Sequence, residues 1–300
     1  MILKAFKYRI YPNNEQRTLL NKHFGCSRFV YNWGLETRIK EYQETQKSLS
    51  SIELSARLTK LKQELEWLGE VNSQALQASL RNLDNAYTRF FRQKKGFPKF
   101  KKKIGRQSFQ CPQKSEVDFE TGTISIIKVK KIKAVLHRKF KGKIKTVTIS
   151  RTPTNKYFAS VLVETPDKPK KVKKPKQDKA VGIDLGLKHF ITLDTGEKVD
   201  NPKHLQKSTN ELKRLNRWTK RKNKGSKRRE KARFKLAKLY ERITNQRNDF
   251  LHKLSTRLIR ENQSVCLENL NVQGMLKSLF GSFNIICLLV EICRNATIQG

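Results

Sequence analysis

Two carboxylates in this sequence stand at the ends of short apolar runs, where they could hold a metal ion. Asp184 follows Ala180–Ile183 in the segment KAVGIDLG, and Glu268 follows Val265–Leu267 in SVCLENL. Short apolar runs that end in turn residues or charges predict buried strands. A carboxylate beside a buried strand needs a compensating cation, hydrogen bond or water. Because carboxylate-bound Mg²⁺ can activate water for attack on a phosphodiester, the pair predicts a metal-dependent hydrolytic site.

The charge of the chain indicates a polyanionic partner. Its 300 residues include 66 Lys and Arg against 26 Asp and Glu, a formal net charge of +40. Such a charge repels itself in a compact fold unless much of it faces a polyanion, and nucleic acid is the leading candidate. No apolar run reaches the length of a spanning helix, and the N-terminus lacks the pattern of a signal peptide. We therefore expect no membrane partner and a cytoplasmic location.

Two segments concentrate this positive charge. The loop KKGFPKFKKK, residues 94–103, interleaves lysines with Phe97 and Phe100. That pattern suits phosphate contact combined with base stacking, or alternatively a loop that the two phenylalanines anchor while only the lysines face outward. Residues 207–233 contain thirteen Lys and Arg against Glu211 and Glu230 only. A solvated helical face would carry more acidic partners at i,i+4 spacing, so this segment predicts phosphate binding. The residues predicted to bind nucleic acid are Lys94, Lys95, Lys99, Lys101, Lys102, Lys103, Lys213, Arg214, Arg217, Lys220, Arg221, Lys227, Arg228 and Arg229.

The remaining sequence predicts the elements that position these sites. Alternating residues at 2–10, 123–132, 143–150 and 157–164 predict a small β-barrel, and amphipathic runs over about residues 13–95 predict a helical bundle inserted after its first strand. Asn13 or Asn14 and Ser50 or Ser51 are the expected helix caps, and Gly25 and Gly34 leave open whether the first helical segment is one helix or two.

The second half predicts a separate α/β domain. Residues 165–179, with seven lysines and three prolines, predict a linker. Beyond it we expect a hairpin at Asp184, a turn at Thr195–Gly196, and one long helix from Ser226 to about Asn262 whose apolar stripe would cover a sheet.

Several motifs, in order along the chain, resemble the OrfB/TnpB proteins of bacterial insertion sequences. They are KYRIYPNNEQ, RFVYN, GFPKFKKK, GIDLG, QRNDFLHKLS and LENL, and the likeness covers about residues 1–277. The resemblance implies a nucleic-acid-binding β-barrel with a helical insertion over residues 1–164, followed by a RuvC-type, ribonuclease-H-like α/β nuclease domain. It also implies a transposase or accessory protein that acts as an RNA-guided DNA endonuclease. Its partners would be DNA and a guide RNA, and catalytic Asp184 and Glu268 would bind Mg²⁺.

The sequence departs from the family pattern after Lys277. The family places a CxxC…CxxC zinc ribbon and a third catalytic Asp there, whereas residues 278–300 are apolar with no lysine and one arginine, Arg294. The five cysteines are scattered and form no CxxC pair, which predicts reduced core thiols and does not support structural zinc. We therefore expect a frameshifted or truncated copy, an incomplete RuvC-like domain at 180–277, and weak or absent cleavage.

Two other interpretations of the chain stay open. Sugar kinases and chaperone-type ATPases use a turn similar to GIDLG, but they follow it with Thr or Ser and add a second Gly-rich phosphate turn. Here Leu187, Lys188 and His189 follow, no second such turn occurs, and His189 is interpreted as a surface or packing residue. The other alternative is a nucleic-acid-binding remnant without catalysis, which the net charge alone would support.

Overall fold

The computed structural model describes residues 1–166, 180–186 and 189–267. The chain divides into two compact units, Met1–Lys168 and Pro169–Gly300. Glu268, the apolar segment 278–300 and all but the first two residues of the predicted linker lie outside the described residues.

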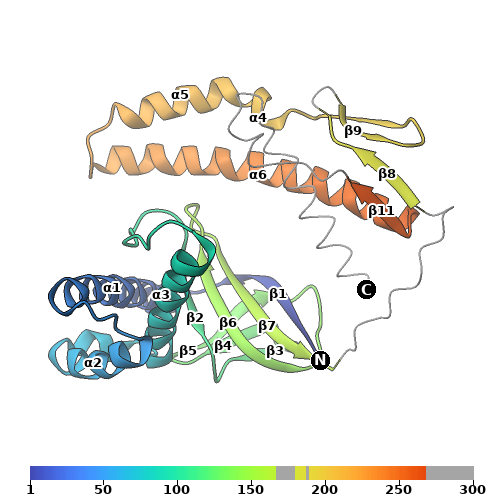
Figure 1. Ribbon diagram of the computed structural model, residues 1–300. Coiled ribbons are helices and arrows are strands. Elements are labelled where there is room, and N and C mark those ends of the chain that lie inside the picture. Colours follow the sequence, from blue (N-terminus) through green and yellow to red (C-terminus); the bar gives the residue numbers. More distant parts are fainter. Residues whose placement is uncertain (167–179, 187–188, 268–300) are drawn as a thin grey trace. The chain divides into compact units, whose positions relative to one another are not determined.

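The first unit is built on a curled antiparallel sheet of seven strands (Figure 1). The strand order is β2-β6-β7-β1-β5-β4-β3. Every second side chain of β7 is buried, as an alternating sequence predicts. Within residues 1–166 no pairing joins the edge strands β2 and β3, so the predicted barrel takes the form of a curled sheet. The strands are β1 (Ile2–Tyr11), β2 (Gln107–Cys111), β3 (Glu116–Asp118), β4 (Thr123–Ile126), β5 (Val129–Val135), β6 (Lys143–Arg151) and β7 (Tyr157–Thr165).

Residues 123–132 form a hairpin, and the prediction of one continuous strand is wrong. β4 ends at Ile126 and β5 begins at Val129. The turn places Lys128 at a φ of 67°. A left-handed turn residue is usually Gly, Asn or Asp, so the sequence carries no signal for this turn. Ile126 pairs with Val129 across it, and both side chains are buried.

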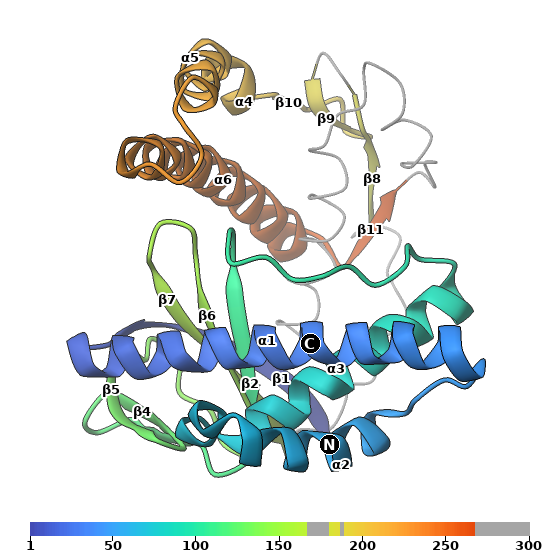
Figure 2. The same cartoon turned by 90° about the vertical axis from the view of Figure 1, so that its left-hand side faces the viewer.

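The helices of the first unit lie between β1 and β2 along the chain. They are α1 (Asn14–Thr45), α2 (Ser51–Glu64), the 3₁₀ helix η1 (Glu66–Glu70) and α3 (Ser73–Gln93). Asn13 caps α1 in a reciprocal capping box with Gln16, and Ser50 caps α2 in the same way with Glu53. α1 continues without a break through its two glycines (Figure 2), so the alternative of two helices is wrong.

The second unit contains a four-stranded sheet of order β10-β9-β8-β11. Its strands are β8 (Ala180–Asp184), β9 (His189–Leu193), β10 (Lys198–Asp200) and β11 (Ser264–Leu267). β11 runs parallel to β8, whereas the other pairs are antiparallel. Parallel neighbours need a long crossover. Here the crossover contains α4 (His204–Lys207), α5 (Thr209–Lys220) and α6 (Lys227–Glu261).

The apolar stripe of α6 packs against two partners. Its N-terminal half contributes Leu239 and Ile243 to a cluster with Leu212 of α5. Its C-terminal half contributes Leu254 and Leu258 to a core with the sheet. The predicted long helix is confirmed, and its stripe covers α5 as well as the sheet. The structure adds that Ser226 caps it. Among the described residues, no helix combines the length and apolar content that a membrane span requires.

Candidate functional site

Asp184 is the last residue of β8, and its side chain is exposed. Its backbone pairs with Thr192 of β9. On the other side of β8, Ile183 pairs with Leu267, the last residue of β11. Glu268 follows Leu267 directly in the sequence and lies outside the described residues. The structure therefore places the strands that lead to both predicted carboxylates next to each other.

A further carboxylate, Asp194, supports the start of this hairpin. Its Oδ2 accepts a hydrogen bond from the Gly182 N–H at 2.8 Å, and its own N–H donates to the Gly182 carbonyl at 3.0 Å. A Cβ on Gly182 would lie 3.3 Å from Asp194 Oδ2. The first glycine of GIDLG thus leaves room for this carboxylate. Sequence reasoning did not single out Asp194, and its only signal was its position directly before the Thr195–Gly196 turn.

His189 is engaged within the same sheet. Its Nδ1 lies 2.8 Å from Oδ1 of Asp200 at the end of β10. The strand register shifts between Val199 and Asp200. The contact therefore links the ends of β9 and β10 at an irregular point of the ladder, as a packing residue would.

Among the described residues, no group of three or more His, Cys, Asp or Glu side chains could hold a metal ion. Asp184 offers an exposed carboxylate at a strand end, and such hard oxygen ligands fit Mg²⁺.

Of the described cysteines, Cys26 and Cys111 are buried, as predicted, whereas Cys266 is exposed. Burial raises the pKa of the Cys111 thiol to about 12. Cys111 is therefore a neutral core thiol at physiological pH.

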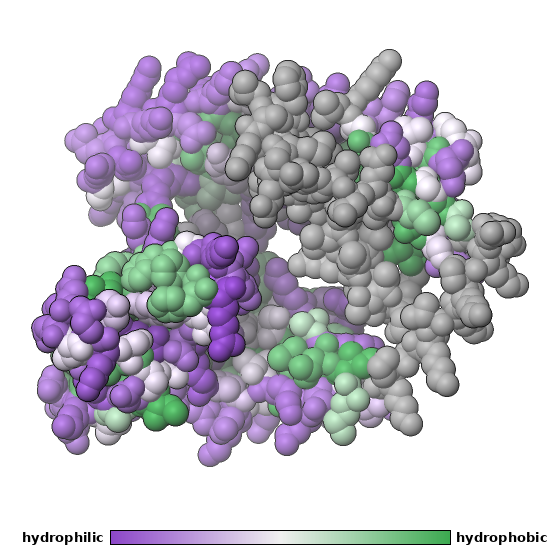
Figure 3. All heavy atoms as spheres, in the orientation of Figure 1, coloured by the Kyte–Doolittle hydropathy of each residue, from purple (hydrophilic) through white to green (hydrophobic). Residues whose placement is uncertain are grey.

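The basic loop after α3 combines anchored and exposed aromatic rings. Phe97 packs edge-on against Tyr87 and Phe90, with ring centroids 5.6 and 5.4 Å apart. It nevertheless keeps 46% of its surface exposed, and Phe100 keeps 51%. Figure 3 shows hydrophobic side chains at the surface where α3 ends. Phe97 therefore anchors the loop, as the second alternative predicts, whereas base stacking on the exposed part of the rings stays a prediction.

Lys101 ties this loop back to α1. Its backbone N–H donates to Asn32 Oδ1 at 2.7 Å, and its carbonyl accepts from Asn32 Nδ2 at 3.0 Å. Its Nζ lies 3.8 Å from the centroid of the Tyr31 ring. The motifs RFVYN and GFPKFKKK thus meet in the fold. All six lysines of the loop, Lys94, Lys95, Lys99, Lys101, Lys102 and Lys103, are exposed, and the ammonium of Lys101 also interacts with an aromatic ring.

The predicted basic residues of the second unit lie on α5 and on the first turn of α6. They are Lys213, Arg214, Arg217, Lys220, Arg221, Lys227, Arg228 and Arg229, and all except Arg229 are exposed. Arg229 donates from Nη1 to the carbonyl of Lys222 at 2.8 Å, so it also holds the α5–α6 connection. Glu211, one of the two acids of this segment, is paired with Arg242 at 2.6 Å.

Comparison with known proteins identifies the family. Residues 160–279 match the OrfB model described as "Probable transposase", and residues 1–47 match a model described as "Helix-turn-helix domain". A Streptomyces pristinaespiralis protein named "Putative RNA-guided DNA endonuclease" is 39% identical over 282 residues, which cover 92% of this chain and 69% of that protein. The chain belongs to the OrfB/TnpB family. A second OrfB/TnpB relative, "Putative RNA-guided DNA endonuclease InsQ" of Escherichia coli K12, is 31% identical over 93% of this chain and 69% of its own length.

Family membership confirms the resemblance seen in the motifs and makes this a transposase-associated chain. The geometry of residues 1–47 differs from the description of the model that matches them. A helix-turn-helix needs two helices joined by a turn. In this OrfB/TnpB chain the segment holds β1 and one helix, α1, which is unbroken to Thr45. DNA recognition by a helix-turn-helix therefore has no geometric basis in these residues.

Proposed function

We propose that this chain binds DNA and a guide RNA as an RNA-guided DNA endonuclease with a RuvC-like site, in which Asp184 and Glu268 would hold Mg²⁺. The observation that carries the proposal is the parallel pairing of β8 with β11, in register from Ser264–Ala180 to Leu267–Ile183. Asp184 and Glu268 each follow one member of the last pair. Because neighbouring Cα atoms along a chain lie about 3.8 Å apart, each carboxylate would start one residue spacing beyond this pair. The carboxyl ends of parallel strands also share one edge of a sheet, where ligands bind.

The order of the second sheet supports the same assignment. Three antiparallel strands, β8, β9 and β10, are followed by helices and then by β11 beside the first strand. Ribonuclease-H-like domains share this arrangement of a meander and a helical crossover to a parallel strand. On this proposal residues 1–164 form the nucleic-acid-binding domain, residues 165–179 the linker and residues 180–277 a partial RuvC-like domain.

The residues of the chain would divide the work of the reaction. When bound, Mg²⁺ would activate water and stabilise the leaving oxygen. The Asp184 carboxylate supplies an exposed ligand at the strand end, and Asp194 fixes the backbone of β8 two residues before it. The exposed cations of α5 and of the loop after α3 would bind the phosphates of the nucleic acid.

For the sequence as it stands we propose weak or absent cleavage. Asp184 and Glu268 supply two carboxylates, and in place of the third the apolar segment 278–300 follows, which we propose to be out of frame. Fewer charged ligands hold divalent ions less tightly. The alternative function is nucleic-acid binding without any metal chemistry.

Asp184→Asn tests the site. The chain would be purified with its cellular RNA, the RNA sequenced, and a matching DNA duplex offered with Mg²⁺. We expect one enriched guide RNA, and we expect Asp184→Asn to abolish whatever weak cleavage the unchanged chain shows while DNA affinity is unchanged. Asp249→Asn removes an exposed carboxylate that pairs with Lys253 on α6, and should change neither.

Luminescence of Tb³⁺, a hard cation that can report an oxygen-ligand site, decides the case in which the unchanged chain does not cut. We expect Asp184→Asn to weaken Tb³⁺ binding and Asp249→Asn to leave it unchanged. Equal Tb³⁺ binding by the unchanged chain, Asp184→Asn and Asp249→Asn would refute the metal site. The alternative function, nucleic-acid binding without metal chemistry, would then remain. Robust cutting by the unchanged chain would instead contradict the proposed impairment.

A further inference from the structure

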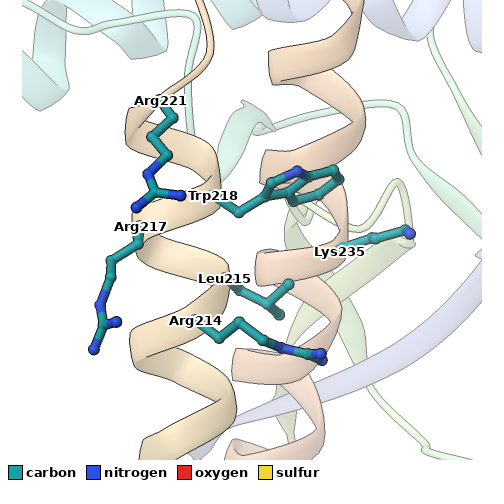
Figure 4. Close-up of a pocket in the computed structure, with 6 residues that line it drawn as sticks. All are labelled: Arg214, Leu215, Arg217, Trp218, Arg221 and Lys235. Atoms are coloured by element: carbon teal, nitrogen blue, oxygen red, sulfur yellow. The ribbon is translucent and has the colours of Figure 1, made fainter.

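α5 carries one tryptophan among its basic residues, and this side chain lines a hollow in the second unit. The hollow has a volume of about 400 Å³, a size typical of small-molecule sites. Its lining consists of Arg214, Leu215, Arg217, Trp218, Arg221 and Lys235 (Figure 4). Four of these six side chains are cations and none is an acid, so the hollow attracts anions.

Helix geometry places the ring and the arginines in one arc of α5, with Arg217 and Trp218 at the two edges of that arc. Arg214, Arg217, Trp218 and Arg221 recur at intervals of three or four residues, which places them on one face of a helix. Figure 4 shows the indole and the Arg214 side chain reaching from α5 across α6. Arg217 and Arg221 lie along the other edge of α5 in the same view.

An apolar seam beside this face fixes the two helices. Leu212 of α5 packs with Leu239 and Ile243 of α6, and Leu215 packs against the same cluster. Trp218 lies next to this seam and is partly exposed. A ring that served only to fill the seam would be buried within it. The position of Trp218 instead leaves part of an aromatic surface facing a cationic hollow.

Two lysine ammoniums lie over the Trp218 ring. The Nζ of Lys235 lies 5.4 Å and that of Lys222 lies 5.9 Å from the ring. Both distances are within the range of a cation–π contact, which at an exposed site contributes little. Glu211 on the same helix is paired with Arg242. The hollow therefore combines a partly exposed aromatic ring, which two ammoniums approach only loosely, with positive charge that no acid of its lining neutralises.

We propose that this hollow binds one unpaired nucleotide of a single-stranded nucleic acid. The base stacks on Trp218, and the phosphates on either side of it contact Arg214, Arg217 and Arg221. A paired base in a duplex already has neighbours on both faces and cannot offer a free face to the indole. The site therefore selects single strands over duplexes, whereas arginines alone would not. The proposal rests on the proposed function and adds to it a specific site for an unpaired strand.

The three tryptophans of the chain make the stacking observable. Replacing Trp33 and Trp67 by Phe leaves Trp218 as the only tryptophan. The probes are a dT strand of roughly twelve nucleotides, an abasic strand with the same number of phosphates, and an rU strand of equal length. We expect dT or rU to quench Trp218 fluorescence and the abasic strand to leave it nearly unchanged. The difference between dT and rU tells whether the site prefers a DNA or an RNA strand.

Trp218→Leu removes the stacking surface and leaves the cations. We expect its affinity for the preferred strand to fall by about fivefold to a hundredfold, with abasic-strand affinity retained as evidence that the arginines are still in place. Trp218→Phe should recover part of the loss. Trp67→Leu is the matched control, because Trp67 is also partly exposed and packs on Phe29 in the first unit.

The outcomes separate this inference from the proposed function. If the abasic strand binds the unchanged chain as tightly as dT and rU, and Trp218 fluorescence does not respond, the stacking site is refuted while nucleic-acid binding stands. If no strand binds at all, the proposed function fails with it. Should Trp218→Leu not fold, the fluorescence of the single-tryptophan protein still decides the question.

Discussion

At the scale of residues, the candidate site depends on contacts that hold the strand carrying Asp184 in place. Asp184 is exposed at the end of β8, and the strand that carries it is held by the Asp194 carboxylate through the Gly182 N–H. A side chain at position 182 would press on Asp194 at 3.3 Å. The first glycine and the aspartate of GIDLG therefore differ in role: Gly182 makes room for the contact with Asp194, and Asp184 presents the exposed carboxylate that we propose as a metal ligand.

His23 shows how a buried titratable residue can tie stability to pH. It is fully buried on α1. Its Nδ1–H donates to the Leu19 carbonyl at 2.8 Å, and its Nε2 accepts from the Asn72 N–H at 3.1 Å, a tautomer that follows from these backbone partners. Both ring nitrogens are thus satisfied only in the neutral imidazole. Burial lowers the pKa of His23 below its ordinary value, the nearby charge of Lys128 lowers it further, and the bond to Leu19 opposes the shift.

The sign of the pH dependence follows from this lowered pKa. Well above pH 6.5 both the folded and the unfolded state keep His23 neutral, so its full contribution to stability is present there. As the pH falls below the unfolded pKa near 6.5, the unfolded state takes up a proton that the folded state resists. We expect the free energy of unfolding to fall by at most about 1.4 kcal/mol per pH unit from this group.

His23→Gln isolates this contribution, because Gln can donate and accept but does not titrate. Urea denaturation from pH 7.5 to about 5 would be compared between the two proteins, so that other titrating groups cancel. The difference in stability between parent and variant should shrink as the pH falls. Parallel pH profiles would show that His23 is protonated in the folded state at no cost.

At the scale of elements, the two glycines of α1 differ in their surroundings. A Cβ on Gly34 would lie 2.8 Å from Leu80 Cδ2 and 3.2 Å from Leu83 Cδ2, both on α3 and both fully buried. A Cβ on Gly25 would meet nothing within 4 Å. Gly34 therefore allows α1 to approach α3, whereas Gly25 only weakens the helix.

Matched alanine substitutions test this difference. Gly25→Ala should stabilise the chain by about 0.5–1 kcal/mol, because Ala favours the helix. Gly34→Ala gains the same propensity but overpacks the α1–α3 contact, which costs about 1–3 kcal/mol. We expect Tm to rise by about 2–4 °C for Gly25→Ala and to fall for Gly34→Ala in thermal unfolding. Equal stabilisation by both would mean that Leu80 and Leu83 move aside freely.

Elements with regular periodicity could be predicted from the sequence, and features fixed by long-range packing could not. α6 begins at Lys227, next to its predicted start at Ser226, because its apolar stripe is a local signal. The close approach of α1 to α3 depends on Gly34, and the β4–β5 turn depends on Lys128 adopting a conformation that its residue type disfavours. Neither cause is visible in a local window of sequence.

The same limit applies to the candidate sites. The position of Asp184 at a strand end follows from its neighbours in sequence. The register of β8 with β11, the bond from Asp194 to Gly182 and the contact of Lys101 with Tyr31 all join segments far apart in the chain. Sequence reasoning supplied the charged residues of α5, but not that Trp218 stands beside a hollow among them.

At the scale of the whole molecule, separate cores carry a large excess of charge. The curled sheet and the helical bundle have cores within the first unit, and the β8–β11 sheet and the α5–α6 pair have cores within the second. No described core cluster contains residues of both units. Self-repulsion from a net charge of +40 therefore acts on two units that are each stabilised by their own apolar clusters, and a bound polyanion would relieve it in both.

Substitution of Lys227 and Arg228 tests which of the basic residues contact DNA phosphates. Both are exposed in the first turn of α6. The positive end of the helix dipole disfavours cations there and favours a bound phosphate. If each contacts one phosphate of a duplex, changing both to Gln should lower the slope of log affinity against log salt by about 1.8 in magnitude.

A control variant that also loses two positive charges separates direct phosphate contact from the general attraction of DNA to a positively charged protein. Lys47 and Lys60 are exposed in the first unit and lie outside the predicted binding residues. Fluorescence anisotropy with one DNA duplex at several salt concentrations would compare the two double variants. We expect Lys47→Gln with Lys60→Gln to leave the slope nearly unchanged. The reason is that counterion release counts only the phosphates that the protein neutralises. Equal decreases of the slope in the two double variants would mean that DNA binding responds to net charge alone.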